Sequence, residues 1–264
     1  MRIRPKHFRL DPTNHMAKGL VFAGLGWGHG ATRMFDSSLR RNNGALTNMD
    51  PASDWVFVPE LGRWGLEFDG DSTEGVNCGL ATFSQGLREC SISTWLRPHL
   101  ADLYAQVVSK WTYLRCQRHT SDRLQFWVNS QALYSSNNIW VDDEWIHLVF
   151  TYNADGDGKG IYVNGDLDAT DTTPQTETLN TDTDGVWLGE HPDGGGATDY
   201  AGLLSDPLVY NRALTPTEIA DLADPHNVSL SGMLDWGRTR KRYFLPTSSS
   251  IIPHVMHYRR LMST

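Results

Sequence analysis

Carboxylates stand at alternate positions in the segment GLEFDGD (65–71), as Glu67, Asp69 and Asp71. In a β-strand, alternate side chains share one face, so three acidic groups would lie side by side there. Such a group could serve general acid–base catalysis, hold a calcium ion through its oxygens, or simply face solvent. Glu74 follows closely enough to add a further oxygen ligand. We expect Asp69 and Asp71 to bind a metal or order the loop, and Glu67 to be a solvent-facing strand residue.

Other reactive residue types form no catalytic pattern. The histidines lack the i, i+4 or His-x-His partner of a zinc site, and the sequence contains neither Gly-x-Ser-x-Gly nor a phosphate-binding loop. Three cysteines leave at least one unpaired, and their spacing fits no zinc motif, so we expect free, buried thiols. The segment NADGDGKG (153–160) begins like an EF-hand calcium loop but lacks the glutamate at its twelfth position, which favours a hairpin turn.

Charge is divided unevenly along the 264 residues, whose net formal charge is −8. Residues 1–9 hold four basic residues, residues 236–264 hold six, and neither segment holds an acid. Taking these ten from the 23 basic residues leaves 13 against all 31 acidic residues, so residues 10–235 carry a formal charge of −18. An acidic body of this kind would repel phosphate, which argues against nucleic-acid binding.

The basic ends have two interpretations, as solvated tails or as anchoring arms. The C-terminal segment mixes its arginines with apolar and aromatic residues and has no helix or strand period. We expect it to lie extended against its own domain or against other subunits, where its apolar residues are buried and its arginines meet carboxylates. The residues expected to anchor the chain are Arg2, Arg4, Lys6, Arg238, Arg240, Lys241, Arg242, Tyr243, Phe244, Arg259 and Arg260.

The segments between these ends predict a sheet protein. Short stretches of alternating polarity, separated by turn signals, fill residues 18–212, as in a β-sandwich or jelly roll. Asn164 and Gly165 supply the positive-φ pair of a type I′ hairpin turn. One short helix is expected within residues 214–225, and its cap, first position and capping-box acid are Thr215, Pro216 and Glu218.

Membrane and export signals are both missing from this sequence. No run of about 18 apolar residues is present, so we expect no membrane span. The first residues are basic but lack the apolar segment and the small-residue cleavage site of a signal peptide, so nothing in them directs export.

The order of six segments resembles that of a known family. They are MFDSSLRRNNGALTN (34–48), GLEFDG (65–70), ECSISTWLRP (89–98), DDEWIHLVFTYNADGDGKGIYVNGDLDA (142–169), VWLGE (186–190) and YAGLLSDPLVYNRALTPTEIADL (200–222). This order is similar to that of the laminin-G-like jelly rolls of the concanavalin A-like lectin and glucanase superfamily, over about residues 19–223. The resemblance implies a jelly-roll sandwich of two antiparallel sheets. Together with the charge pattern and the short helix, the expected organisation is an extended basic N-terminal arm (1–18), an all-β jelly-roll sandwich (19–223), and a linker with a basic C-terminal arm (224–264). The resemblance also implies core or near-core positions for Trp95, Trp145, Tyr152 and Tyr162.

The resemblance also bears on the acidic residues. Glucanases of this superfamily carry E-x-D-x-x-E or E-x-D-x-E, but Ser72 and Asp71 stand at the two final positions here, so we expect no enzyme activity. Many relatives hold calcium near this strand, and they have two consecutive acids where this chain has Ser205 and Asp206. Pro207 must then lie at a sheet edge or a bulge. Calcium is therefore the candidate cofactor, and its candidate ligands are Asp69, Asp71, Glu74 and Asp206.

Carbohydrate binding is the main rival function. A lectin-type site needs one or two exposed aromatic rings with polar groups beside them. The loop-adjacent candidates are Trp27, Trp55, Trp64, Trp111 and Trp140. Trp111 forms the best exposed cluster together with Tyr113, although a single tryptophan more often packs in a core.

The function predicted from these features is that of a non-enzymatic structural or binding protein, a jelly roll anchored by its arms in a larger assembly. It resembles the add-on jelly rolls of phage and other virions, such as head decoration or fibre proteins. Its expected partners are protein subunits such as capsid or tail proteins and further copies of itself in a homo-oligomer. Its expected location is the virion, or the cytoplasm at synthesis. The alternative is a calcium-assisted carbohydrate-binding or adhesion module acting on a cell-surface glycan, and a glycoside hydrolase is the least favoured of the three.

Overall fold

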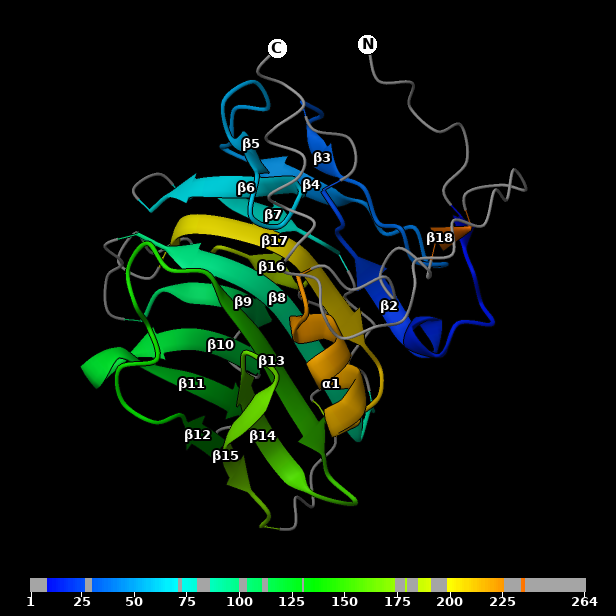
Figure 1. Cartoon of the computed structure of the whole chain (residues 1–264), viewed down its shortest axis with the longest axis vertical. Helices are drawn as coiled ribbons and strands as arrows, with labels where there is room; N and C mark the ends of the chain where they lie inside the picture. The colour runs from blue at the N-terminus through cyan, green and yellow to red at the C-terminus, as the bar shows by residue number, and fades with distance from the viewer. Residues whose placement is uncertain are drawn as a thin grey trace, which may run out of the picture.

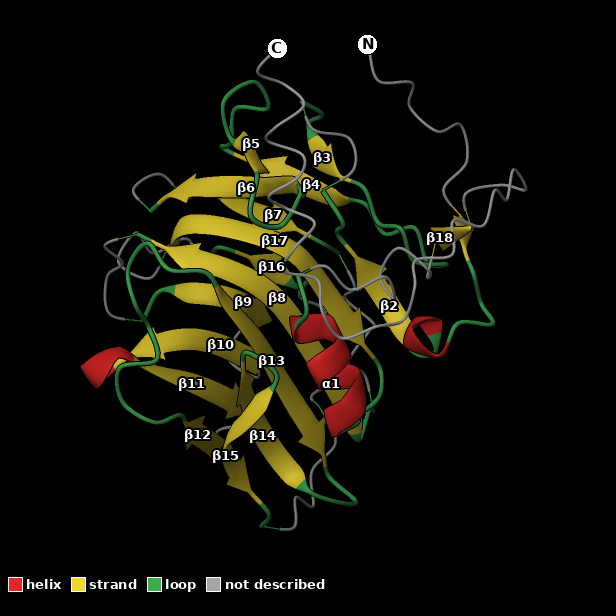
Figure 2. Cartoon of the chain, viewed as in Figure 1, coloured by secondary structure: helices red, strands yellow, loops and turns green. Residues whose placement is uncertain are grey.

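Two antiparallel β-sheets lie face to face in the computed structural model of the chain (Figure 1). The structure describes residues 9–26, 30–70, 73–79, 86–99, 104–110, 114–129, 131–173, 179, 185–190, 199–225 and 234–235. The predicted all-β jelly-roll sandwich with a single α-helix among the described residues is confirmed (Figure 2).

The first sheet contains the longest strands of the chain. Its order is β15 (Asp166–Asp171), β14 (Gly158–Val163), β13 (Ile146–Asn153), β8 (Glu89–Pro98), β17 (Ala201–Tyr210), β6 (Arg63–Asp69) and β5 (Trp55–Val58). An additional strand, β2 (Leu20–Ala23), pairs with the far end of β17.

The second sheet forms the other layer of the sandwich. Its order is β12 (Gln131–Tyr134), β11 (Arg123–Val128), β10 (Leu114–His119), β9 (Gln106–Lys110), β16 (Trp187–Leu188), β7 (Gly75–Asn77), β4 (Gly44–Thr47) and β3 (Arg33–Met34). Two short 3-10 helices, η1 (His15–Ala17) and η2 (Thr120–Asp122), lie outside the sheets, and β1 (Arg9–Leu10) pairs with β18 (Leu234–Asp235).

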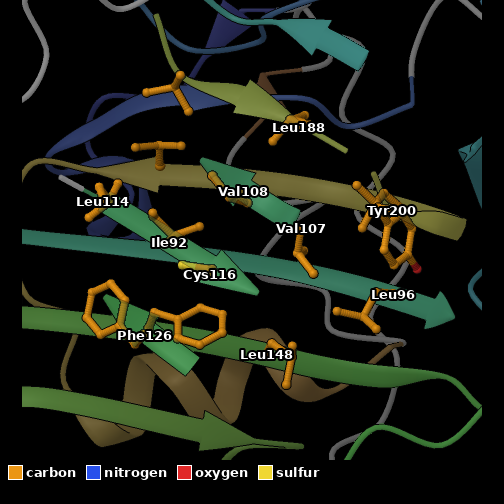
Figure 3. Packing of buried hydrophobic residues seen from close by; sticks show 14 of the residues in the cluster. Ile92, Leu96, Val107, Val108, Leu114, Cys116, Phe126, Leu148, Leu188 and Tyr200 are labelled. Carbon is orange, nitrogen blue, oxygen red and sulfur yellow. The ribbon is translucent and has the colours of Figure 1, made fainter. Parts of the chain in front are cut away.

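The main core fills the space between the two sheets (Figure 3). Alternating residues of each strand point into it, because successive side chains of a strand face opposite sides. Phe126 of β11 meets Phe150 of β13 with ring centroids 5.4 Å apart. Burying one such side chain contributes about 1.5–3 kcal/mol relative to leaving it exposed. The expected core aromatics follow this pattern, since Trp95 and Tyr152 are buried and Trp145 and Tyr162 pack partly buried against apolar clusters.

The helix α1 (Pro216–Ala223) covers part of the outer side of the first sheet (Figure 2). Its N-cap is Thr215, whose hydroxyl accepts from the backbone N–H of Glu218, while the Glu218 carboxylate accepts from the backbone N–H of Thr215. This is the predicted capping box, and Pro216 takes the first helical position. Ile219 and Leu222 pack against apolar residues of β13 and β17.

Two further turn predictions are met. Asn164 and Gly165 have φ values of 51° and 93° and join β14 to β15, as a type I′ hairpin requires. Pro207 lies in β17, a strand paired on both sides, and the pairing register with β8 shifts between Ser205 and Leu208. The proline is therefore accommodated in a β-bulge, where Asp206 has a φ of 50°.

The described end of the predicted N-terminal arm packs into the domain. Leu10, Met16 and Ala17 are buried and share an apolar cluster with Leu20 of β2. Apolar packing of the domain thus begins at least as early as Leu10, on the N-terminal side of residue 19, where the sequence placed the start of the sandwich.

Cys78, Cys90 and Cys116 are free and buried, as expected. Among the described residues, no helix has the length and apolar character needed to cross a membrane.

Candidate functional site

The segment 65–71, most of which lies in β6, has apolar side chains in the core and acidic side chains on the outer side of the first sheet. Alternation turns Leu66 and Phe68 into the core and leaves Glu67 and Asp69 on the outer side of the first sheet. The Glu67 carboxylate is half exposed and lies 3.4 Å from Nε2 of His99, whose Nδ1 lies 2.7 Å from Oδ1 of Asp143. Glu67 is therefore a surface residue in an ion-pair group.

Asp69 and Glu74 are brought together by the structure. The backbone N–H of Asp69 donates to Glu74 Oε2 at 2.8 Å. Burial raises the pKa of Glu74, against the effect of this hydrogen bond, and the nearby carboxylates of Asp69 and Asp54 raise it further. Asp71, the third acid of the segment, lies outside the described residues.

Asp206 lies away from that pair. Ala201 pairs with Asp69, so Asp206 is five residues further along β17, a distance of about 16 Å. Its carboxylate is buried and forms an ion pair with Arg63. The described residues contain no cluster of three or more histidine, cysteine or acidic side chains arranged to hold a metal ion. The three described candidate ligands, Asp69, Glu74 and Asp206, are thus not gathered in one place, and calcium binding stays a prediction.

The tryptophans singled out by the sequence are mostly core residues. Trp55 and Trp140 are buried, and Trp64 packs partly buried against the main core. The remaining candidates, Trp27, Trp111 and Tyr113, lie outside the described residues. The same holds for the predicted anchoring residues Arg2, Arg4, Lys6, Arg238, Arg240, Lys241, Arg242, Tyr243, Phe244, Arg259 and Arg260.

A different set of polar and aromatic residues gathers on the side of the second sheet that faces away from the core, which we call the outer face. The core side of these strands is formed by the alternate residues Leu188, Val108, Cys116 and Phe126, visible in Figure 3. The pairing registers therefore place one row across four neighbouring strands on the outer face: Trp187, Ser109, Arg115 and Trp127.

A second row on the outer face is a hydrogen-bonded chain of amides. Gln106 Nε2 donates to Gln117 Oε1 at 2.6 Å, Gln117 Nε2 donates to Gln125 Oε1 at 2.6 Å, and Gln125 Nε2 donates to the Tyr134 hydroxyl at 2.9 Å. All three glutamines are buried. Oε1 of Gln106, at the end of this chain, has no hydrogen-bond partner within the described structure. This acceptor is therefore both unpaired there and shielded from solvent, which is energetically unfavourable.

Arg115 and Trp127 form a pair between the strands β10 and β11. The guanidinium carbon of Arg115 lies 4.9 Å from the ring centroid of Trp127, a cation–π distance. Burial lowers the pKa of Arg115. Its Nε is buried and, in the part of the chain that the structure describes, has no hydrogen-bond partner. The pair thus combines an aromatic ring with an unused donor.

Glu190 follows β16 directly and borders the same face. Its backbone carbonyl accepts from the Ser109 hydroxyl at 2.6 Å, which fixes the chain beside β9. The carboxyl is only 6% exposed, and its Oε2 has no partner among the described residues. Burial and then the nearby Asp199 raise the pKa of Glu190 to about 7. A Cβ on Gly75 would stand 2.6 Å from this Oε2, so only glycine leaves room for the carboxyl.

Exposed aromatic rings extend the face toward β12. The His119 ring lies 4.8 Å from the Tyr134 ring and 5.3 Å from the Tyr104 ring, in edge-to-face arrangements. The Arg123 guanidinium lies 4.7 Å from the Tyr134 ring. Burial, and secondarily the charge of Arg123, lower the pKa of His119, so its ring is neutral at neutral pH. Chemically, the outer face offers rings for stacking and unpaired polar atoms for hydroxyl or carboxylate groups.

Comparison with known proteins gives the family. The family model described as the concanavalin A-like lectin/glucanases superfamily matches residues 69–220, more than half of the chain. Among curated protein sequences, none matches the chain.

Several solved structures share the fold at low sequence identity. Domain 4 of AbnA, an extracellular arabinanase from Geobacillus stearothermophilus solved in complex with arabinotriose, has a TM-score of 0.59 and 16% identity, covering 78% of this chain and 98% of that domain. Trypanosoma rangeli sialidase, in complex with 2,3-difluorosialic acid, has a TM-score of 0.59 and 14% identity over 81% of this chain. The chain spans only 33% of that sialidase.

Proposed function

The chain belongs to the concanavalin A-like lectin/glucanase superfamily, and on this basis we propose that it binds carbohydrate on the outer face of the second sheet without cleaving it. One observation carries the proposal. The outer face places the rings of Trp187, Trp127 and Tyr134 on the same side as polar atoms of Gln106, Arg115 and Glu190 that have no partner in the described structure. A small number of polar groups among aromatic rings is typical of ligand-binding sites.

The chemistry of these groups suits a sugar. A sugar ring presents an apolar C–H face, which packs on an aromatic ring, and hydroxyls that donate and accept hydrogen bonds at its rim. The Tyr134 hydroxyl and the Arg123 guanidinium, at the more exposed end of the face, can form such hydrogen bonds with a sugar. The arabinotriose bound to the similar AbnA domain is consistent with such a use of the fold.

The burial of the nearby carboxyls supports the proposal of binding without cleavage. Hydrolysis needs two carboxyls flanking one glycosidic bond, both reachable by the sugar. Glu190 and Asp199 are coupled, but each is more than nine-tenths buried. A glycosidic oxygen of a sugar on the outer face would therefore not reach a position between the carboxyls of Glu190 and Asp199.

The test is a binding assay on the full chain with oligosaccharides, by glycan array and then calorimetry, with and without calcium. Trp127→Ala is expected to weaken binding about 10-fold, because stacking and buried ring area are lost. Phe57→Ala is the matched control, because Phe57 is an exposed aromatic residue of β5 in the other sheet. Equal loss in both variants, or no glycan bound by the wild type, would refute the proposal. Release of reducing sugar by the wild type would instead identify a hydrolase.

The assembly role predicted from the basic ends has its own support. β1 and β18 pair with Arg9 opposite Asp235, so the inner limits of the two basic segments, residues 1–9 and 236–264, lie side by side. We propose that the two segments together anchor the jelly roll in a larger assembly such as a virion. Light scattering of the full chain beside a chain ending at Asp235 tests this. An oligomer that becomes a folded monomer on truncation supports the anchor, and two identical masses contradict it.

A further inference from the structure

We propose that the carbohydrate bound on the outer face is acidic, and that Arg115 binds its carboxylate. This inference rests on the proposed function, since it names the class of ligand for the same site. The outer face as a whole gives no reason to expect a charged ligand, because most of its polar groups are neutral amides and rings. The reason lies in two arginines.

Four arginines of the described structure are paired with carboxylates: Arg63 with Asp206, Arg88 with Asp155, Arg118 with Asp122 and Arg212 with Glu218. Arg97 of the first sheet lies over the Trp145 ring without such a partner among the described residues. Arg115 and Arg123 are different. Both are on the outer face, and neither has a carboxylate partner among the described residues. In a body with an excess of acids, two arginines on one face without a carboxylate partner among the described residues favour an anion as ligand there.

An anion would stabilise the charge of Arg115 in particular, because this guanidinium is partly buried. Burial already lowers its pKa, because the guanidinium has lost part of its hydration without gaining an opposite charge. The Trp127 ring holds the guanidinium, and Nε remains unpaired. The terminal N–H groups of a guanidinium form an edge that can donate two parallel hydrogen bonds to a carboxylate. The group is therefore oriented and unsatisfied before the ligand arrives.

The same face also orients the ligand. Trp187 stands in the row of Arg115 two strands away, and Glu190 is three residues further along, so the backbones of Glu190 and Arg115 lie about 14 Å apart. An ionised Glu190 would repel a carboxylate. Arg123 stands four residues from Trp127 along β11, about 13 Å away. Acidic units are therefore expected over β10 and β11, and a neutral unit over β16.

The experiment compares acidic and neutral forms of the same sugar on the full wild-type chain, by calorimetry. The two pairs are tetragalacturonate with its carboxyl-reduced form, and sialyllactose with lactose. In at least one pair, the acidic form is expected to bind about 10- to 100-fold more tightly, the range for hydrogen bonds to a charged group. Raising the salt concentration should reduce this preference, because the ion pair is partly screened.

Variants assign the preference to Arg115. Arg115→Gln should bind acidic and neutral forms equally. Arg88→Gln is the control and should keep the wild-type preference, because Arg88 precedes β8 of the first sheet and is paired with Asp155. Thermal unfolding of Arg115→Gln checks its folding, and the wild-type comparison stands without it. Tight binding of neutral sugars with no acidic preference would overturn this inference and leave the proposed function standing. Binding of no sugar at all would overturn both.

Discussion

Replacing Glu190 by glutamine should stabilise the protein at alkaline pH and leave its stability unchanged at acidic pH. In the folded chain, burial and the neighbouring Asp199 raise the pKa of Glu190 to about 7, from an ordinary value near 4.5. Between these two values the folded state keeps a proton that the unfolded state has lost. Stability contributed by this proton is therefore full below about pH 4.5 and is lost as the pH rises toward 7.

The size of the effect follows from the shift. One unit of pKa corresponds to about 1.4 kcal/mol, so the free energy of unfolding of the wild type should fall by about 2.5 kcal/mol between pH 5 and pH 8 on account of this group. Glutamine has the same shape and no charge, so the variant avoids this loss. For a domain of this size, the melting temperature of Glu190→Gln should exceed that of the wild type by about 5–10 °C at pH 8.

The assay is thermal or urea unfolding of both proteins across pH 5–8. Only the difference between the two curves is read, because Asp206 and other groups titrate in the same range. Glu60→Gln, at an exposed position, is the control and should follow the wild type at every pH. A stability difference between Glu190→Gln and the wild type that stays constant with pH would show that the carboxyl is not protonated in the folded state. The account of its buried, unpaired Oε2 would then be wrong.

Three further outcomes are expected. Arg63→Ala should cost about 3–5 kcal/mol at pH 8 by removing the partner of the buried Asp206, and less at pH 5, where that carboxyl, whose pKa burial raises to about 6, is protonated; an equal loss at both pH values in urea unfolding would contradict this. Thr215→Ala should lower the free energy of unfolding by about 1 kcal/mol through loss of the helix cap, and an unchanged melting temperature would count against the capping box. A thiol reagent should label none of the three cysteines in the native protein and all of them in denaturant, because burial raises their thiol pKa values and blocks access; labelling of the native protein would disprove their burial.

Local chemistry was predictable from the sequence wherever neighbouring residues decide the structure. The cap of α1 depends on Thr215 and Glu218, which are three residues apart, and the hairpin depends on the adjacent Asn164 and Gly165. Pro207 in a strand required an edge or a bulge, and the bulge is present. In each case a short-range steric or hydrogen-bonding rule is enough.

The acidic residues could not be assigned in this way. The family resemblance suggested Asp69 and Asp206 as ligands of one calcium site. Their actual separation depends on the pairing register of β6 and β17, which is long-range and which no local sequence pattern encodes. The partner of Asp206 is Arg63, which is 143 residues away in sequence. A buried acid near a strand end therefore predicts a metal ligand or an ion pair equally well until the register is known.

The outer face was missed for a related reason. Its residues come from separate strands, and within any one strand they read as the polar half of an ordinary alternation, as in RLQFWVN (123–129). Only the pairing of β9, β10 and β11 aligns Gln106, Gln117 and Gln125 into one chain of hydrogen bonds. A cross-strand row of identical amides is visible only once the order and register of the strands are fixed.

The outer face is also a poor choice for stability alone. Its glutamines are buried although they point away from the core, and atoms of Gln106, Arg115 and Glu190 lack partners in the described structure. A half-satisfied polar network is less stable than apolar packing of the same volume. A partly buried arginine without an acidic partner loses hydration and gains no ion pair, which destabilises the fold. Proteins place such unsatisfied groups together where a ligand completes them. These three atoms are themselves shielded from solvent, so a sugar carrying hydroxyls and a carboxylate would contact the exposed rings and the guanidinium groups that surround them.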